Sequence, residues 1–151
     1  MSHDADVEKL LDFAISEEQG AADFYNGLAA KMNSDAMKKV FEGFAKEELG
    51  HKAKLEAIKS GNKTFSGGAK PMDLKIGDYL VEGEVSADMD FQDALVIAMK
   101  KEKAAFRMYS DLAAATNDAG LRDVLLGLAQ EEAKHKLRFE IQYDEEILTE
   151  N

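Results

Sequence analysis

Apolar residues recur at alternating steps of four and three residues in four separate segments of this chain. In the first segment the residues that share this spacing are Val7, Leu11, Ala14, Ala21, Tyr25, Leu28 and Met32. Residues three and four apart lie on one face of an α-helix, so each segment predicts a helix with one apolar face. Because four such faces must cover one another, the pattern predicts an all-α four-helix bundle.

Two kinds of connection separate the predicted helices. The stretches "MNSDA" (32–36) and "TNDAG" (116–120) are short and rich in turn and N-cap residues, so each predicts a helical hairpin. The stretch at about 60–88 is long, breaks the helical period, and predicts a crossover from one end of the bundle to the other. Five apolar residues indicate that part of this crossover packs on the bundle: Leu74, Ile76, Tyr79, Leu80 and Val81. We expect a single domain over 1–151, with helices at about 4–32, 35–59, 89–115 and 118–147.

Composition excludes several classes of function. The chain has no cysteine, which excludes disulfides, thiolate metal sites and a thiol nucleophile. A formal net charge of −11 disfavours nucleic acid and anionic membranes as partners. No apolar run approaches the roughly 20 residues that span a bilayer, and "MSHDADVEKL" lacks the features of a secretory signal. We therefore expect a cytoplasmic protein with no nucleic-acid or membrane partner.

Six polar residues interrupt the apolar stripes, where a charged side chain costs several kcal/mol unless a partner compensates it. These residues are Glu18, Glu48, His51, Glu102, Glu132 and His135. A single residue of this kind is most often a core side chain that is paired locally or reaches solvent. A regular arrangement of all six calls for a common cause.

An internal repeat supplies that regularity. A shift of 84 residues aligns Glu18 with Glu102, Tyr25 with Tyr109, Glu48 with Glu132 and His51 with His135. Each half therefore has one Glu on its first helix and a Glu-x-x-His pair on its second. The two members of such a pair share a helix face, about 4.5 Å apart along the axis.

The hairpin turns bring these residues to the same depth in the bundle. Glu18 lies 15 residues before Asn33, and Glu48 lies 15 residues after it. A Glu on each of two helices and a Glu-x-x-His pair on each of the other two is the ligand set of di-iron and di-manganese carboxylate bundles. Carboxylates with one imidazole per metal suit iron or manganese, whereas zinc binds such sites but has no redox chemistry. The residues therefore predict that the six bind two metal ions, either iron or manganese, with zinc as a possible substitute.

The sequence also resembles the rubrerythrin branch of the ferritin-like superfamily over all four predicted helices. The resemblance rests on "EEQGAADFY" (17–25), "AKEELGH" (45–51), "KEKAAFRMY" (101–109) and "AQEEAKH" (129–135). It implies that the six residues ligate two irons, with Glu48 and Glu132 bridging them. It also implies a role beside the ligands for Tyr25 and Tyr109, which could equally be plain core aromatics. By contrast, Glu47 and Glu131 are rotated about 100° from the ligand face and are expected to be solvated or paired with lysines, with a role beside the ligands as the alternative.

For function, the resemblance implies a di-iron oxidoreductase that reduces hydrogen peroxide or dioxygen, and a homodimer. Rubrerythrins carry a four-cysteine rubredoxin-like domain that this chain lacks, so we expect a separate electron donor such as rubredoxin. Where rubrerythrins have a further glutamate linked to their peroxide preference, this chain has Ala105, so the oxidant stays open. The alternatives are a ferroxidase or iron-storage protein of the ferritin or bacterioferritin type, and a structural bundle that merely retains metal. The long crossover argues against a storage cage.

Overall fold

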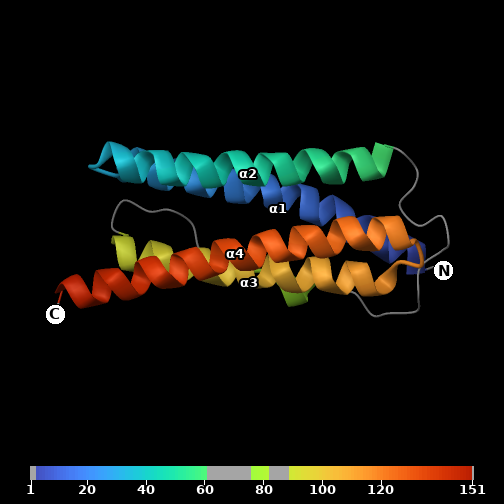
Figure 1. Ribbon diagram of the computed structural model, residues 1–151. Coiled ribbons are helices and arrows are strands. Elements are labelled where there is room, and N and C mark those ends of the chain that lie inside the picture. The colour runs from blue at the N-terminus through green and yellow to red at the C-terminus, as the bar shows by residue number, and fades with distance from the viewer. Residues whose placement is uncertain (1–2, 61–75, 82–88, 151) are drawn as a thin grey trace.

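The protein is a four-helix bundle made of two helical hairpins (Figure 1). The computed structural model describes residues 3–60, 76–81 and 89–150. The elements are α1 (His3–Lys31), α2 (Asp35–Ser60), a short 3-10 helix η1 (Ile76–Tyr79), α3 (Phe91–Ala115) and α4 (Ala119–Glu150). Helix α1 packs along α2, and α3 packs along α4. The predicted ferritin-like fold is therefore confirmed. Over the described residues, none of the helices combines the length and apolar character that crossing a membrane requires.

Side-chain caps fix where three of the helices begin. Ser34, Asp90 and Asp118 each accept a hydrogen bond from the backbone N–H three residues later, at 3.4, 2.7 and 3.0 Å respectively. Such bonds satisfy N–H groups that have no partner within the helix. The third helix therefore begins at Phe91, after its cap, rather than at residue 89.

The apolar core is divided into two clusters along the bundle axis. One contains Leu11, Leu55 and Leu112, and the other contains Phe41 and Phe139. On α1 one cluster lies before Glu18 and the other after it, and on α3 the two clusters flank Glu102 in the same way. The two clusters therefore lie on either side of the polar residues. Together, the two apolar clusters hold the four helices in register around a buried polar centre.

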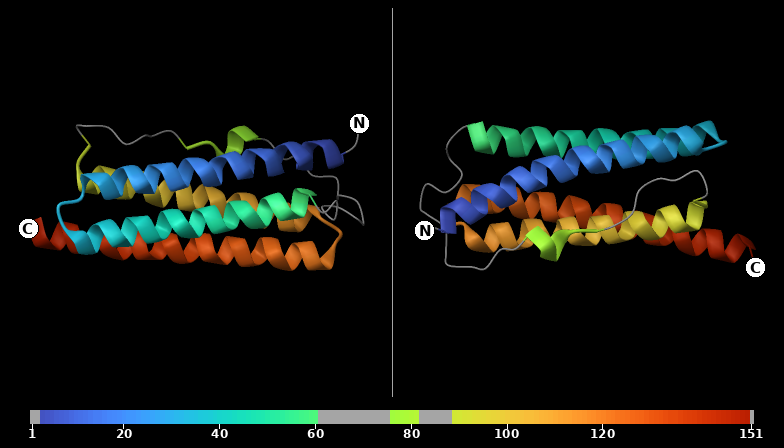
Figure 2. Two further views of the ribbon diagram at one scale, coloured as in Figure 1. Left: turned by 90° about the horizontal axis from the view of Figure 1, so that it is seen from above. Right: turned by 180° about the vertical axis from the view of Figure 1, so that it is seen from behind.

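The crossover packs on the bundle only in part. Segment 76–81 lies beside α3, on the side of the bundle formed by α1 and α3 (Figure 2). Tyr79 is buried and Val81 is half-buried, as expected, but Leu80 is 60% exposed and points away from the core. Leu74 and the side chain of Ile76 lie outside the described residues.

Candidate metal centre

All six polar stripe residues are buried at the middle of the bundle, with fractional exposures between 0% and 5%. Each helix contributes to this centre at one level between the two apolar clusters. The contributions are Glu18 from α1, Glu48 and His51 from α2, Glu102 from α3, and Glu132 and His135 from α4. The structure thus brings together the whole set that the sequence singled out.

The potential ligand atoms form two overlapping groups. Within each group, one nitrogen or oxygen atom from each residue lies within 4.8 Å of all the others. The groups are Glu18, Glu48, His51 and Glu132, and Glu48, Glu102, Glu132 and His135. Glu48 and Glu132 belong to both groups. This arrangement suits two metal ions that share two carboxylates, each with one further carboxylate and one imidazole.

The buried atoms of the centre lie at ion-pair distances from one another but form no hydrogen bonds. The Nδ1 atom of His51 lies 2.6 Å from Glu132 Oε1 and 3.3 Å from Glu18 Oε2. The Nδ1 atom of His135 lies 3.1 Å from Glu48 Oε1. All five of these atoms are buried and have no hydrogen-bond partner. Since buried polar atoms are almost always satisfied, a cluster of unsatisfied carboxylate and imidazole atoms fits residues that ligate metal.

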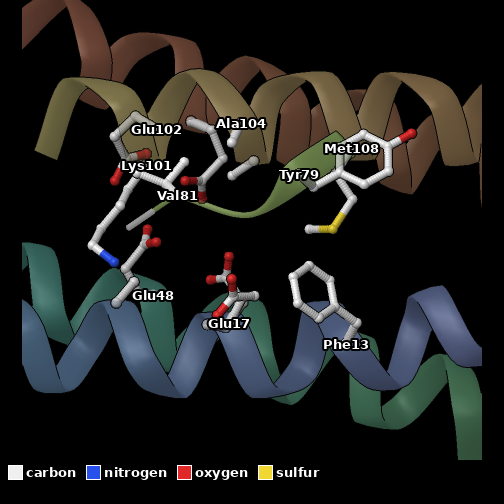
Figure 3. Close-up of a pocket in the computed structure, with 13 residues that line it drawn as sticks. Phe13, Glu17, Glu48, Tyr79, Val81, Lys101, Glu102, Ala104 and Met108 are labelled. Atoms are coloured by element: carbon white, nitrogen blue, oxygen red, sulfur yellow. The ribbon is translucent and has the colours of Figure 1, made fainter. Parts of the chain in front are cut away.

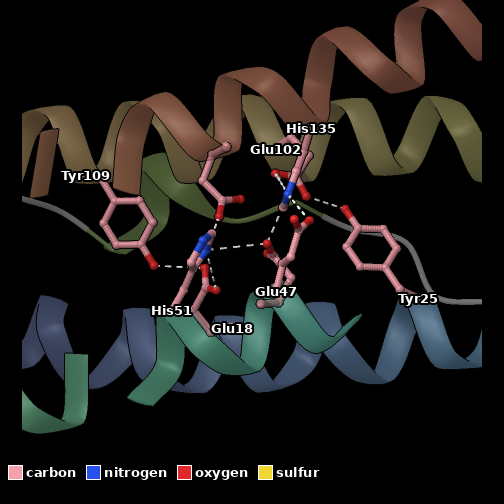
Figure 4. A network of polar contacts seen from close by, with 9 residues as sticks. Glu18, Tyr25, Glu47, His51, Glu102, Tyr109 and His135 are labelled. Atoms are coloured by element: carbon pink, nitrogen blue, oxygen red, sulfur yellow. Dashed lines mark hydrogen bonds and ion pairs between the residues drawn. The ribbon is translucent and has the colours of Figure 1, made fainter. Parts of the chain in front are cut away.

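Two buried tyrosines hold carboxylates of the opposite hairpin (Figure 4). The Tyr109 hydroxyl on α3 donates to Glu18 Oε1 on α1 at 2.8 Å. Reciprocally, the Tyr25 hydroxyl on α1 donates to Glu102 Oε1 on α3. Each bond leaves the second oxygen of its carboxylate directed to the centre. Hydrogen bonds of this kind fix the orientation of metal-ligating carboxylates.

Glu47 contacts the centre, contrary to the expectation that it is solvated. Its side chain is 49% exposed, yet Glu47 Oε2 accepts a hydrogen bond from His135 Nε2 at 2.7 Å (Figure 4). This bond leaves His135 Nδ1 facing the buried carboxylates. Its counterpart in the repeat, Glu131, pairs with Lys134 at 3.8 Å, as expected of a surface residue. The one feature of the sequence that could have indicated this contact is the acidic residue directly before each Glu-x-x-His pair.

The crowding of carboxylates shifts the pKa values in the metal-free centre. Burial, followed by the charge on Glu102, raises the pKa of Glu48 to about 8. Burial also raises the pKa of Glu132 well above its ordinary value. Burial would lower the pKa of His135, but its contacts with Glu102 and Glu48 outweigh that effect and raise the pKa to about 10. The centre therefore holds protons that a divalent cation would displace, so metal affinity should increase with pH.

A pocket of about 40 Å³ reaches this centre from the surface between α1 and α3. Four of the buried carboxylates line it: Glu18, Glu48, Glu102 and Glu132. Exposed Glu17 and half-buried Lys101 lie along the same pocket (Figure 3). The centre is therefore accessible to a small molecule without opening the bundle.

Comparison with known proteins agrees with this description. The family model described as Rubrerythrin matches residues 9–143. The chain belongs to the rubrerythrin family, which supports a di-iron protein of the ferritin-like superfamily. Among solved structures, a hypothetical protein from Pyrococcus furiosus is similar, with a TM-score of 0.70 and 28% sequence identity. The match covers 91% of this chain and 88% of that chain. No curated protein matches this sequence.

Proposed function

We propose that this protein is a di-iron oxidoreductase that reduces hydrogen peroxide or dioxygen with electrons from a separate donor such as rubredoxin. The main support is the pair of overlapping ligand groups that share Glu48 and Glu132. In this proposal Glu18 and His51 complete one iron position, and Glu102 and His135 complete the other. Membership of a family that typically binds iron supports the choice of metal.

The protein's own residues prepare the site for this chemistry. Four carboxylates balance the charge of two divalent ions, and Tyr25 and Tyr109 keep two of those carboxylates oriented. The two apolar clusters exclude water from either end of the centre. When bound, two ferrous ions supply the two electrons that, with two protons, convert hydrogen peroxide into two molecules of water.

We further propose that the chain forms one domain, acts as a cytoplasmic homodimer, and has neither nucleic acid nor a membrane as a partner. Sedimentation of the iron-loaded protein tests the assembly. A dimer agrees with the proposal, whereas a very large particle would favour the ferroxidase and iron-storage alternative.

The activity is tested by loading the protein anaerobically with two ferrous ions per chain and mixing it with stoichiometric peroxide or dioxygen. Stopped-flow absorption then gives the two oxidation rates. Faster reaction with peroxide supports a peroxidase, and faster reaction with dioxygen supports an oxidase or ferroxidase. Oxidation no faster than that of ferrous ion in buffer, with either oxidant, would contradict the proposal.

A further inference from the structure

The wall of the access pocket includes two residues of the crossover, Tyr79 and Val81. Phe13 of α1 and Met108 of α3 face each other at one end of the pocket, beside Tyr79 (Figure 3). Val81, from the same crossover segment as Tyr79, also lines the pocket. The pocket is open to solvent, and its volume of about 40 Å³ holds about three water-sized molecules. The space that leads to the carboxylates is therefore narrow, and the crossover forms one side of it.

Several contacts fix Tyr79 in this wall. Its hydroxyl donates a hydrogen bond of 2.5 Å to Asp111 Oδ2 on α3. The guanidinium carbon of Arg107 lies 5.9 Å from the centre of its ring. The side chain is only 4% exposed and belongs to the same apolar cluster as Met108. A buried aromatic ring with a hydrogen bond to a charged acceptor has little freedom to move aside.

We propose that Tyr79 sets the size limit for oxidants that reach the centre, so that hydrogen peroxide and dioxygen enter and alkyl hydroperoxides do not. This inference rests on the proposed function, because it concerns access to the same centre. Hydrogen peroxide is little larger than water and fits the pocket. The branched alkyl group of tert-butyl hydroperoxide is too bulky for a pocket of about 40 Å³.

The two peroxides require the same numbers of electrons and protons for their reduction. Each takes up two electrons and two protons as its O–O bond breaks. Hydrogen peroxide gives two molecules of water, and tert-butyl hydroperoxide gives one water and one tert-butanol. The electrons are those of the proposed activity in both cases. A difference between their rates that depends on Tyr79 therefore reports access to the centre.

The first test compares Tyr79→Ala with the wild type and with Leu80→Ala. Leu80 is the matched control, since it is the next residue but is 60% exposed. In the wild type and in Leu80→Ala, hydrogen peroxide should oxidise the ferrous protein far faster than tert-butyl hydroperoxide. In Tyr79→Ala the ratio of the two rates should fall by roughly tenfold or more, as for other steric limits in pockets. Equal rates in the wild type, or an unchanged ratio in Tyr79→Ala, would overturn the inference.

A binding measurement separates access from activity. Azide and benzoate each carry one negative charge but differ in size, and both can be titrated into cobalt-loaded protein by visible absorption. The wild type should bind azide but not benzoate, and Tyr79→Ala should bind both. Benzoate binding to the wild type would overturn the inference. If these results hold but no variant is oxidised faster than free ferrous ion, the proposed function fails and the size limit stands.

A second variant acts in the opposite direction and keeps the test informative if Tyr79→Ala does not fold. Ala105 lines the pocket and is half-buried, so Ala105→Leu should narrow it. We expect this variant to bind two cobalt ions, to bind azide at least tenfold more weakly and to react more slowly with hydrogen peroxide. Unchanged azide affinity in Ala105→Leu would contradict the assignment of this pocket as the path to the centre.

Discussion

In the metal-free protein, Glu48→Gln should increase stability although it alters a fully buried residue. Glu48 is 1% exposed, and burial together with the charge on Glu102 raises its pKa to about 8. At neutral pH this side chain is therefore protonated in the folded protein and ionised in the unfolded chain. Glutamine has nearly the same shape and takes up no proton on folding, so the substitution removes an energetic cost.

The size of the effect depends on pH. A carboxyl whose pKa rises from 4.5 to about 8 on folding makes the folded state progressively less stable as the pH rises between these values. Each pH unit in that window costs about 1.4 kcal/mol. The cost is therefore about 3 kcal/mol at pH 7 and about 1 kcal/mol at pH 5. For a chain of this size, 3 kcal/mol corresponds to roughly 6–12 °C in melting temperature.

The assay is thermal unfolding of chelator-treated protein, followed by circular dichroism at pH 5 and pH 7. Glu56→Gln, at an exposed position of the same helix, is the control and should change stability by less than about 0.5 kcal/mol. Glu48→Gln should raise the melting temperature more at pH 7 than at pH 5. A melting temperature that is unchanged or lowered by Glu48→Gln at pH 7 would refute the reasoning that this carboxyl is kept at a cost to stability.

Three further predictions concern the metal-bound protein. Metal removal should lower stability by about 3 kcal/mol per site at a free metal concentration 100-fold above Kd. Because metal displaces protons from the centre, the loss of stability on metal removal should increase from pH 6 to pH 8, as measured by calorimetry. A loss of stability that decreases over this range would contradict the pKa shifts. Glu47→Gln should weaken the binding of one of the two cobalt ions by roughly 10- to 100-fold, because Glu47 orients His135. The control Glu131→Gln should have little effect on cobalt affinity, since Glu131 pairs with a lysine. Equal effects of the two substitutions would contradict this difference between Glu47 and Glu131. Tyr109→Phe removes the donor to Glu18 and should cost about 1–3 kcal/mol in urea unfolding of the loaded protein; no loss would make the hydrogen bond unimportant.

The helices and the six buried polar residues could be predicted because both depend on spacing within a helix. An apolar stripe with period 3.6 shows which face is buried, and a Glu or His on that face is visible in the sequence alone. The internal repeat added that Glu18 and Glu102 occupy equivalent positions. The fold then places both at the same level as the Glu-x-x-His pairs.

Contacts between helices were harder to predict. Glu47 lies off the buried face of its own helix, so its spacing indicated a solvated residue. Its contact with His135 depends on how α2 and α4 flank each other, which periodicity along one helix does not encode. The crossover has no period at all. For that reason the sequence did not distinguish buried Tyr79 from exposed Leu80.

The measurement that tests the central claim most directly is an anaerobic titration of the metal-free protein with ferrous ion. We predict tight binding of two ions per chain in the wild type and in the surface variant Glu56→Ala. Glu48→Ala and Glu132→Ala, which each remove a carboxylate common to both ligand groups, should lose tight binding of one or both ions. Unchanged stoichiometry in both variants, or no tight binding in the wild type, would contradict a di-iron centre formed by these residues.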